Sequence, residues 1–317
     1  MRPHKFRHSL TAESALDLIG NTPLLKLDRA YRGRGRILAK AEFMQPGGSI
    51  KDRAAKAILL QAIADHRLSP GMTVVEMTSG NMGAGLAVVC AALGHPLVLT
   101  MSAGSSFART GILKALGAEV ILVDQVDGTP GMVTGRDIAA AADVARKIAQ
   151  DRDGFYVDQF NAPEAIAAHE TGTGRELVEQ SGGGISAWVS AVGTGCTFVG
   201  VAKALKSWNE GIVCAAAEPL GCRPLLGEEV VKPAHVIQGT GYGRVPPHWD
   251  PKLMDVSIAV SDDDARLWRH KLATMEGLHV GFSSGANVCA AARLLESGRV
   301  PADSAVATVL CDTGWKY

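Results

Sequence analysis

Hydrophobic runs and helix-type patterns alternate along most of the chain. Short aliphatic or β-branched runs predict strands, and longer segments with helical periodicity predict the helices that follow them. The expected strand and helix pairs are 73–77 with 83–93, 96–101 with 105–116, 119–123 with 134–151, and 187–191 with 198–208; further strands are expected at 212–217 and 304–310. This alternation is typical of parallel strands joined by helices. We therefore expect an α/β protein with two doubly wound, mainly parallel sheets.

Two long segments, 124–133 and 219–251, have little regular pattern and contain several glycines and prolines. Long loops of this kind in compact α/β proteins are often lids or walls of binding sites. The first lobe is expected to end near Phe155.

Composition narrows the classes of function. The 317 residues include 32 Lys or Arg and 32 Asp or Glu, so no excess charge favours nucleic acid or an anionic membrane surface as a partner. Segment 77–108 contains no Asp, Glu, Lys or Arg, but the breaks at 80–83 and 94–96 predict a buried strand, helix and strand instead of a membrane span. Six cysteines without a C-x-x-C pair indicate free thiols in a reducing compartment, so we expect a cytoplasmic protein and no metal site.

Lys51 is the first candidate for chemistry. It lies between a Gly47-Gly48 turn and a helix-patterned run. Glycines let the backbone pass close to a flat ligand, and Ser49 is a suitable N-cap for the helix. A lysine fixed at this place is suited to forming an imine. Taken alone, the same pattern also fits a solvated lysine at a helix start.

Three further loops lie where a strand or turn leads into a helix. Loop 78–83 supplies free N–H groups, hydroxyls and an amide to an anion, and loop 193–197 has glycine-flanked threonines that suit a phosphate. Turn 281–286 carries Ser283 and Ser284, so one hydroxyl can face a ring nitrogen while the other caps the helix. Each loop alone also fits a capped turn without a ligand. Together with an imine-forming lysine they describe a pyridoxal phosphate site.

These motifs resemble the cysteine synthase and cystathionine β-synthase family, the fold-type II pyridoxal phosphate enzymes that act at the β-carbon of amino acids. The resemblance runs almost from end to end. The matching segments, in order, are 19–24, 47–53, 78–83, 159–160, 193–197, 218–219, 239–241, 283–285 and 312–317.

The resemblance implies roles for individual residues. Lys51 would hold pyridoxal 5'-phosphate as an imine and then remove the α-proton of the substrate. Asn81 would bond the phenolic oxygen of the cofactor, and Ser283 would face its pyridine nitrogen. The phosphate would be held by Gly193, Thr194, Gly195, Cys196 and Thr197, and the substrate would be bound by Thr78, Ser79, Met82 (through its N–H), Gln159, Gly239, Tyr242 and Arg244.

Two positions depart from the family pattern. Met82 stands where most relatives have threonine, so we expect one hydroxyl contact to be lost and a thioether to face the site. Arg244 lies beside Tyr242 in a loop expected to form a wall of the site. Pointing inward, Arg244 would pair with a phosphate or a second carboxylate; pointing outward, it would be an ordinary solvated arginine.

The resemblance also implies an activity and an organisation. The leading hypothesis is β-replacement on O-acetylserine or O-phosphoserine through an aminoacrylate, giving cysteine or a related β-substituted alanine with a small nucleophile. The alternatives are a diaminopropionate-pathway synthase using O-phosphoserine and a nucleophile such as glutamate, a cystathionine β-synthase, or a serine/threonine dehydratase-type lyase.

A homodimer is expected. A smaller, mobile lobe over 38–155 would carry Lys51 and the carboxylate loop, and 1–37 with 156–317 would form a larger cofactor-binding lobe.

Overall fold

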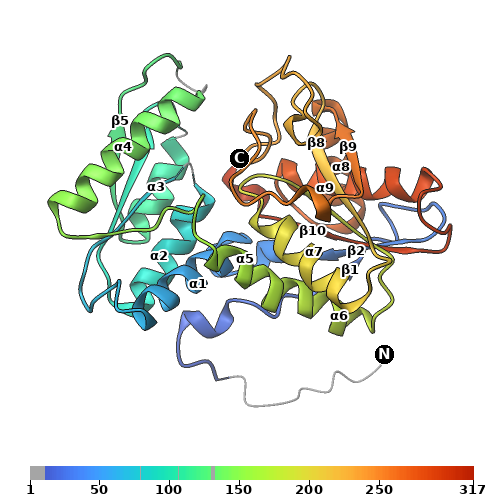
Figure 1. Cartoon of the computed structure of the whole chain (residues 1–317), viewed down its shortest axis with the longest axis horizontal. Coiled ribbons are helices and arrows are strands. Elements are labelled where there is room, and N and C mark those ends of the chain that lie inside the picture. The colour runs from blue at the N-terminus through green and yellow to red at the C-terminus, as the bar shows by residue number, and fades with distance from the viewer. Residues whose placement is uncertain (1–10, 79, 106, 130–132) are drawn as a thin grey trace.

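The computed structural model shows two lobes, each built on its own sheet and lying beside the other (Figure 1). It describes residues 11–317 except 79, 106 and 130–132. The larger sheet has the strand order β1-β2-β10-β7-β8-β9, and the smaller sheet has the order β5-β4-β3-β6. The expected α/β fold with two doubly wound sheets is thereby confirmed.

The larger sheet is parallel except at one edge. Its strands are β1 (Leu24–Lys26), β2 (Arg36–Lys40), β10 (Ala305–Val309), β7 (Ala187–Ala191), β8 (Val213–Pro219) and β9 (Val256–Val260). Only β1 runs antiparallel, against β2, while each other neighbouring pair is parallel. The strands β7, β8 and β10 are almost completely buried, as expected when helices cover both faces of a parallel sheet.

The smaller sheet is parallel throughout. Its strands are β5 (Glu119–Val123), β4 (Leu97–Ser102), β3 (Val74–Met77) and β6 (Phe155–Tyr156). The helices of this lobe are α1 (Lys51–Ala64), α2 (Asn81–Leu93), α3 (Phe107–Ala115) and α4 (Gly135–Asp151). Helix α1 packs against α2, and α4 packs on β3 and β4. The described residues of the uncharged segment 77–108 thus form the end of β3, helix α2 and strand β4, and most of them are buried inside this lobe.

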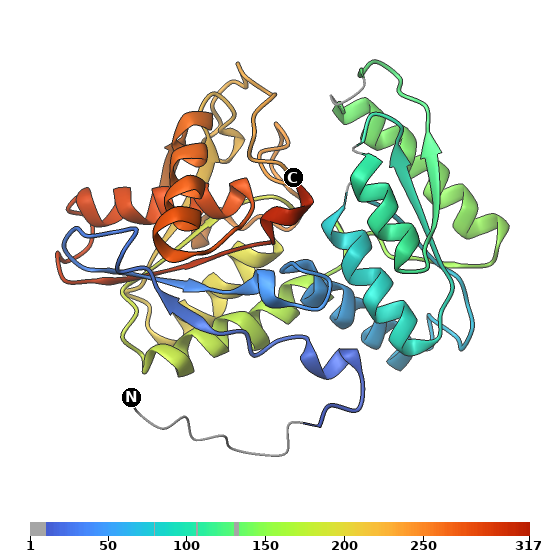
Figure 2. The same ribbon diagram turned by 180° about the vertical axis from the view of Figure 1, so that it is seen from behind.

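The larger lobe carries α5 (Glu164–Ala168), α6 (Arg175–Ser181), α7 (Cys196–Trp208), α8 (Asp262–Glu276) and α9 (Phe282–Glu296), with a π-helical turn η3 (His169–Gly174) between α5 and α6. Short 3-10 turns are η1 (Ala15–Leu18), η2 (Glu42–Met44), η4 (Pro224–Leu226), η5 (Pro251–Leu253) and η6 (Gly314–Lys316). Figure 2 shows the chain crossing between the lobes and the C-terminus lying on the side of the larger lobe that faces the smaller one. No described helix is long and apolar enough to cross a bilayer.

The expected elements match the structure more closely than the expected lobe boundary does. Strands 119–123 and 187–191 have the predicted bounds. The boundary at residue 38, however, falls inside β2, which pairs with β10 in the larger sheet. Because β2 lies between β1 and β10, residues 38–40 belong to the larger lobe, and the chain enters the smaller one only after η2. The boundary at 155 likewise divides β6, whose two residues both belong to the smaller sheet.

Candidate functional site

A pocket lies between the lobes at the carboxyl ends of the parallel strands. Thr78 follows β3, Gly193 follows β7 and Cys311 follows β10, and all three line it. Ligands of open α/β sheets bind at this edge because strand ends and helix N-termini converge there. The predicted site residues that line this pocket are Lys51, Thr78, Asn81, Met82, Gln159, Gly193, Thr194, Gly195, Thr197, Gly239, Tyr242 and Ser283.

Lys51 is the first residue of α1, so the turn before it fixes the start of its side chain. The N-cap is Ile50 and not Ser49, although the Ser49 hydroxyl accepts a bond from the Lys51 N–H at 3.3 Å. Asp52 closes the same turn by accepting from the Gly47 N–H. Burial lowers the pKa of the Lys51 ammonium, an effect that Cys196 and Cys311 oppose. A lysine with a lowered pKa is suited to nucleophilic and base chemistry because more of it is neutral near pH 7.

The wall from the smaller lobe is formed by the start of α2 and the segment after β6. The Thr78 hydroxyl accepts bonds from the Gly80 and Gly83 N–H groups, both at 3.2 Å. A hydroxyl that accepts in this way can still donate its own hydrogen into the pocket. The Gln159 side chain donates to the Met77 carbonyl at 3.3 Å, and its backbone N–H donates to Glu76 at 3.2 Å. These contacts hold Thr78 and Gln159 on one wall.

The loop before α7 forms the opposite wall. Gly195 is the N-cap of α7, has a φ of +90° and offers no side chain to cap the helix. The first N–H groups of α7 therefore point out of the helix, as in anion sites of other proteins. A Cβ added at Gly193 would lie 2.2 Å from the Gly239 carbonyl oxygen. The close approach of these two loops thus requires glycine at position 193.

Ser283 lies in the first turn of α9 and is 6% exposed. The helix begins after Gly281 without a side-chain cap, so neither serine of the turn has the capping role expected from the sequence. Ser284 instead accepts a bond from the Cys311 N–H at 2.9 Å. That bond ties α9 to the segment after β10, and Ser283 remains on the pocket wall.

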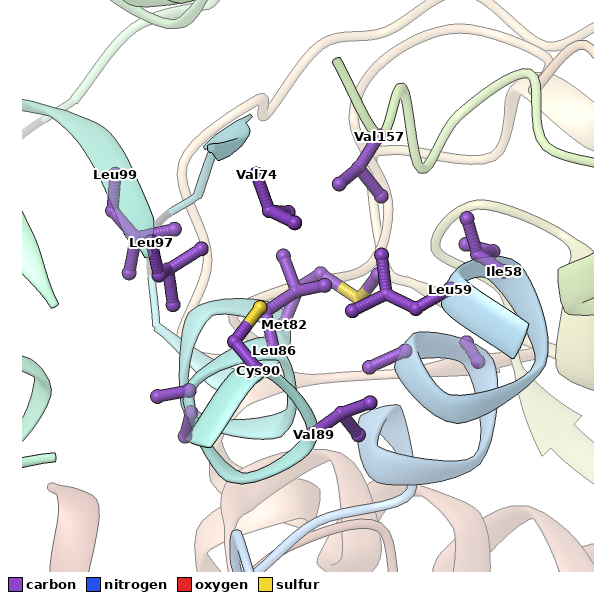
Figure 3. Packing of buried hydrophobic residues seen from close by; sticks show 14 of the residues in the cluster. Ile58, Leu59, Val74, Met82, Leu86, Val89, Cys90, Leu97, Leu99 and Val157 are labelled. Atoms are coloured by element: carbon purple, nitrogen blue, oxygen red, sulfur yellow. The ribbon is translucent and has the colours of Figure 1, made fainter. Parts of the chain in front are cut away.

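Two predicted site residues, Cys196 and Arg244, lie outside the pocket lining. A third, Met82, lines the pocket, but its side chain is almost completely buried. Cys196 is 2% exposed and packs in the apolar core of the smaller lobe, where burial raises its thiol pKa. Arg244 is exposed, with its guanidinium 5.7 Å from the centre of the Phe160 ring. Met82 is part of the pocket wall but only 2% exposed, and its thioether lies among the apolar side chains of α1 and α2 (Figure 3). Ser79 lies outside the described residues.

Comparison with known proteins decides the family. The family model described as "Pyridoxal-phosphate dependent enzyme" matches residues 15–312. The chain belongs to this family. It is 37% identical over 310 residues to a cysteine synthase of Staphylococcus aureus, covering 96% of this chain and 95% of the relative. It is 35% identical over 305 residues to cysteine synthase A of Salmonella typhi, covering 94% and 91%. The predicted membership of the cysteine synthase group is confirmed.

Solved structures agree with this assignment. An O-ureido-L-serine synthase superposes with a TM-score of 0.87 at 32% identity, covering 97% of this chain and 93% of the other. A hydrogen sulfide-producing enzyme from Fusobacterium nucleatum gives a TM-score of 0.89 at 30% identity, covering 98% and 99%. An O-acetylserine dependent cystathionine beta-synthase from Helicobacter pylori gives 0.86 at 30% identity, covering 98% of each chain.

The residues of the pocket fit the family's cofactor. The glycine cradle at Gly193 and Gly195 leads into the N-terminus of a long helix, which suits a phosphate. The hydroxyls of Thr194 and Thr197 lie on the same wall, and the Lys51 amine lies in the same pocket. This set of donors and one amine matches a phosphorylated aldehyde, since the phosphate needs N–H and O–H donors and the aldehyde needs an amine.

The structure adds residues that sequence analysis did not assign. His169 lies behind the phosphate cradle, with Nε2 3.2 Å from the Thr197 hydroxyl and Nδ1 3.0 Å from the Thr173 hydroxyl. Burial lowers the pKa of His169 well below 6.5, and the charges of Arg53 and Lys51 lower it further. A neutral imidazole can hold the Thr197 hydroxyl without adding charge. The signal available in the sequence was weak, because a histidine 28 residues before Thr197 has no pattern linking it to that loop.

A buried ion-pair network around Arg53 holds the first turn of α1 in place. Arg53 donates to both carboxylate oxygens of Glu42, at 2.8 Å each, and to both oxygens of Glu176, at 2.6 and 2.8 Å. Lys40 pairs with Glu176 at 2.5 Å. Bidentate Arg–carboxylate contacts fix geometry as well as adding energy. Since Arg53 lies two residues after Lys51, the network anchors the catalytic turn to η2 and α6.

Proposed function

We propose that this chain catalyses β-replacement on an activated L-serine, with O-acetylserine as the donor and pyridoxal 5'-phosphate as the cofactor. The observation that carries the proposal is the placement of Lys51, with its lowered pKa, in one pocket with a phosphate cradle and a wall of Thr78 and Gln159. Its relatives include cysteine synthases and an O-acetylserine dependent cystathionine beta-synthase, which supports the same class of reaction.

Each residue then has a defined task. The Thr78 hydroxyl and the Gln159 amide hold the substrate carboxylate, and the neutral Lys51 amine removes the α-proton. The backbone N–H groups of Gly195 and its neighbours in α7 hold the phosphate. When bound, the cofactor supplies a ring that stabilises negative charge at the substrate α-carbon. The Ser283 hydroxyl would be the group beside the ring nitrogen, and because it is neutral it would favour prompt loss of the β-leaving group.

The charges of the pocket favour O-acetylserine over O-phosphoserine. Among the residues that the structure describes, the lining contains no Asp, Glu or Arg, and its cations are Lys51 and Lys316. The Lys316 ammonium already donates to Gly47 and Asn81, and Arg244 lies over Phe160 instead of in the pocket. A dianionic leaving group needs strong cationic partners to replace its hydration. A neutral acetyl ester does not.

The composition of the pocket lining also favours a small nucleophile such as sulfide. A glutamate nucleophile would bring an additional carboxylate into a wall made partly of Ile112, Leu113 and Phe198. Burying a carboxylate without a cationic partner is costly. The diaminopropionate-type activity therefore has less support than cysteine formation. Homocysteine, the nucleophile of cystathionine synthesis, is a larger thiol than sulfide, so comparing the two tests whether the pocket accepts a larger nucleophile.

Absorbance spectroscopy of the cofactor-loaded protein tests the proposal. O-acetylserine, O-phosphoserine and serine are added one at a time, followed by sulfide, homocysteine or glutamate, and products are identified by mass spectrometry. We expect the visible band to change with O-acetylserine and to recover on addition of sulfide as cysteine forms. Lys51→Ala should reduce kcat/KM by about 10²- to 10⁴-fold, while Lys203→Ala, at an exposed position of α7, should leave it unchanged.

Other outcomes of this experiment would assign a different activity or refute the proposal. Pyruvate without a β-substituted product would assign a lyase, and a response to O-phosphoserine alone would contradict the argument from pocket charge. A protein that binds no cofactor, or whose spectrum responds to none of the three donors, would refute the proposed function.

We also infer a homodimer in a reducing cytoplasm, with a smaller lobe that closes over the substrate. The six described cysteines are free thiols, which supports the compartment; the dimer and the closure rest on the family resemblance. Light scattering would measure the mass of the particle, and a mass of one chain would contradict the dimer. X-ray scattering would detect closure as a smaller radius of gyration after donor is added, and an unchanged radius would contradict closure.

A further inference from the structure

The segment after β10 turns back toward the pocket and brings Asp312, Lys316 and Tyr317 to its edge. Lys316 and Tyr317 line the pocket. Both views of the molecule show the C-terminal end between the two lobes (Figures 1 and 2). This segment resembles a family motif, but the resemblance implies no role for it.

Asn81 lies between two charges of this segment. The Lys316 ammonium donates to Asn81 Oδ1 at 2.9 Å, and Asn81 Nδ2 donates to Asp312 Oδ2 at 2.7 Å. These two contacts fix which way the amide points. In the opposite orientation the amide NH₂ would face the ammonium and its oxygen would face the carboxylate, and both contacts would be repulsive. An amide nitrogen carries two hydrogens, so Nδ2 can bond Asp312 and still donate a second time.

The two charged partners are themselves held in place. Lys316 also donates to the Gly47 carbonyl at 2.7 Å, and the Tyr317 hydroxyl donates to Asp312 Oδ2 at 2.7 Å. A Cβ added at Gly281 would lie 2.1 Å from Asp312 Oδ1, so this carboxylate packs directly on backbone. The arrangement joins the glycine turn before Lys51, the start of α2 and the end of the chain. Such supporting contacts are what fix a binding group to within a fraction of an ångström.

We propose that Lys316 is a positioning residue that, together with Asp312, orients the Asn81 amide so that its second N–H points at the cofactor. This inference rests on the proposed function, because it requires Asn81 to donate to an oxygen of bound pyridoxal phosphate. Lys316 acts through Asn81 and does not itself contact the reacting atoms. Without the ammonium, the amide loses one of the two contacts that set its orientation, and its bond to the cofactor weakens.

The test compares four forms of the cofactor-loaded protein: wild type, Lys316→Met, Asn81→Ala and the double variant. Lys316→Met keeps an unbranched side chain and removes the charge. We expect Lys316→Met and Asn81→Ala to shift the visible band of bound cofactor in the same direction. Each should lower kcat/KM by about tenfold, in line with the loss of a hydrogen bond to a charged group. The double variant should be no worse than Asn81→Ala alone, because residues that act through one another are not additive.

Two further variants separate positioning from general structural damage. Lys316→Arg keeps a cationic donor and should restore most of the wild-type spectrum, whereas Lys203→Met, on the exposed face of α7, should change neither spectrum nor rate. Circular dichroism melts show whether each variant is folded. A Lys316→Met protein with the wild-type spectrum, or losses that multiply in the double variant, would overturn the inference. Wild-type protein without a cofactor band would instead refute the proposed function, so the two failures are distinguishable.

Discussion

The buried carboxyl of Glu76 gives the most quantitative prediction. Glu76 lies on β3, is 1% exposed and accepts the Gln159 N–H at 3.2 Å. Burial, with a smaller contribution from the charge of Asp158, raises its pKa from the ordinary 4.5 to about 8. The folded protein therefore keeps a proton that the unfolded chain releases. Stability must fall as the pH rises from about 4.5 to about 8.

The magnitude follows from this difference in pKa. One pKa unit corresponds to about 1.4 kcal/mol, so the full effect on the free energy of unfolding is about 5 kcal/mol at high pH. Between about pH 6.5 and about pH 8 the contribution changes by about 1.5 kcal/mol. Asp52, with a raised pKa of about 6, and His169, with a pKa lowered from 6.5 by burial, also change protonation on unfolding near the lower end of this window. The effect of Glu76 is therefore measured against a variant that keeps both groups.

Glu76→Gln removes the titration and keeps an oxygen to accept the Gln159 N–H. Urea unfolding of wild type and variant, followed by circular dichroism, measures the free energy at several pH values in this window. We expect the variant to gain stability relative to wild type by about 1.5 kcal/mol from the lower to the upper pH. Subtracting the two profiles cancels all other titrating groups.

The matched control is Glu119→Gln, on the half-exposed strand β5. Arg152 bonds to Glu119 and keeps its pKa low, so its carboxylate is ionised across the window and the difference from wild type should not vary with pH. A flat difference for Glu76→Gln as well would show that Glu76 is ionised in the folded protein, and it would refute the reasoning from burial.

Three further changes test the packing around the site. Arg53→Met should destabilise the fold by about 3–5 kcal/mol in urea unfolding, because the buried Glu42 carboxylate loses its guanidinium partner and Glu176 keeps only Lys40; a loss under about 1 kcal/mol would show that the network is dispensable. Gly193→Ala should weaken cofactor binding in a fluorescence titration, since its Cβ would lie 2.2 Å from a carbonyl oxygen, whereas unchanged affinity would mean that the two loops separate freely. Met82→Ala should cost about 2–5 kcal/mol and Met82→Leu under about 1.5 kcal/mol, and equal losses would contradict the placement of the thioether in the core.

Much of the candidate site was predictable because its residues are local to strand ends. Thr78 and Gly193 follow buried strands, Lys51 and Ser283 lie in the first turn of a helix that follows a glycine turn, and all four line one pocket. The carboxyl ends of parallel strands necessarily lie at one edge of a sheet. The spacing of apolar runs therefore implied that these loops would meet.

Side-chain direction was much harder to predict. Met82 and Cys196 occupy loop positions that suggested a site, yet both side chains turn into the core. Arg244 stacks on an aromatic ring that is distant in sequence. The direction of each depends on which neighbour fills the remaining volume, and that neighbour comes from another element. A pattern within one loop holds no information about it.

The sequence by itself determined the alternation of strands and helices over 73–151 and 187–217, the chemistry of the glycine loops and the family, because each depends on residues close together in the chain. Only the tertiary structure decided that β2 belongs to the larger sheet, that His169 lies behind Thr197, and that Lys316 reaches Asn81. The last contact joins residues 235 positions apart. Long-range pairings of this kind are set by how the two lobes pack against each other, and no local propensity specifies them.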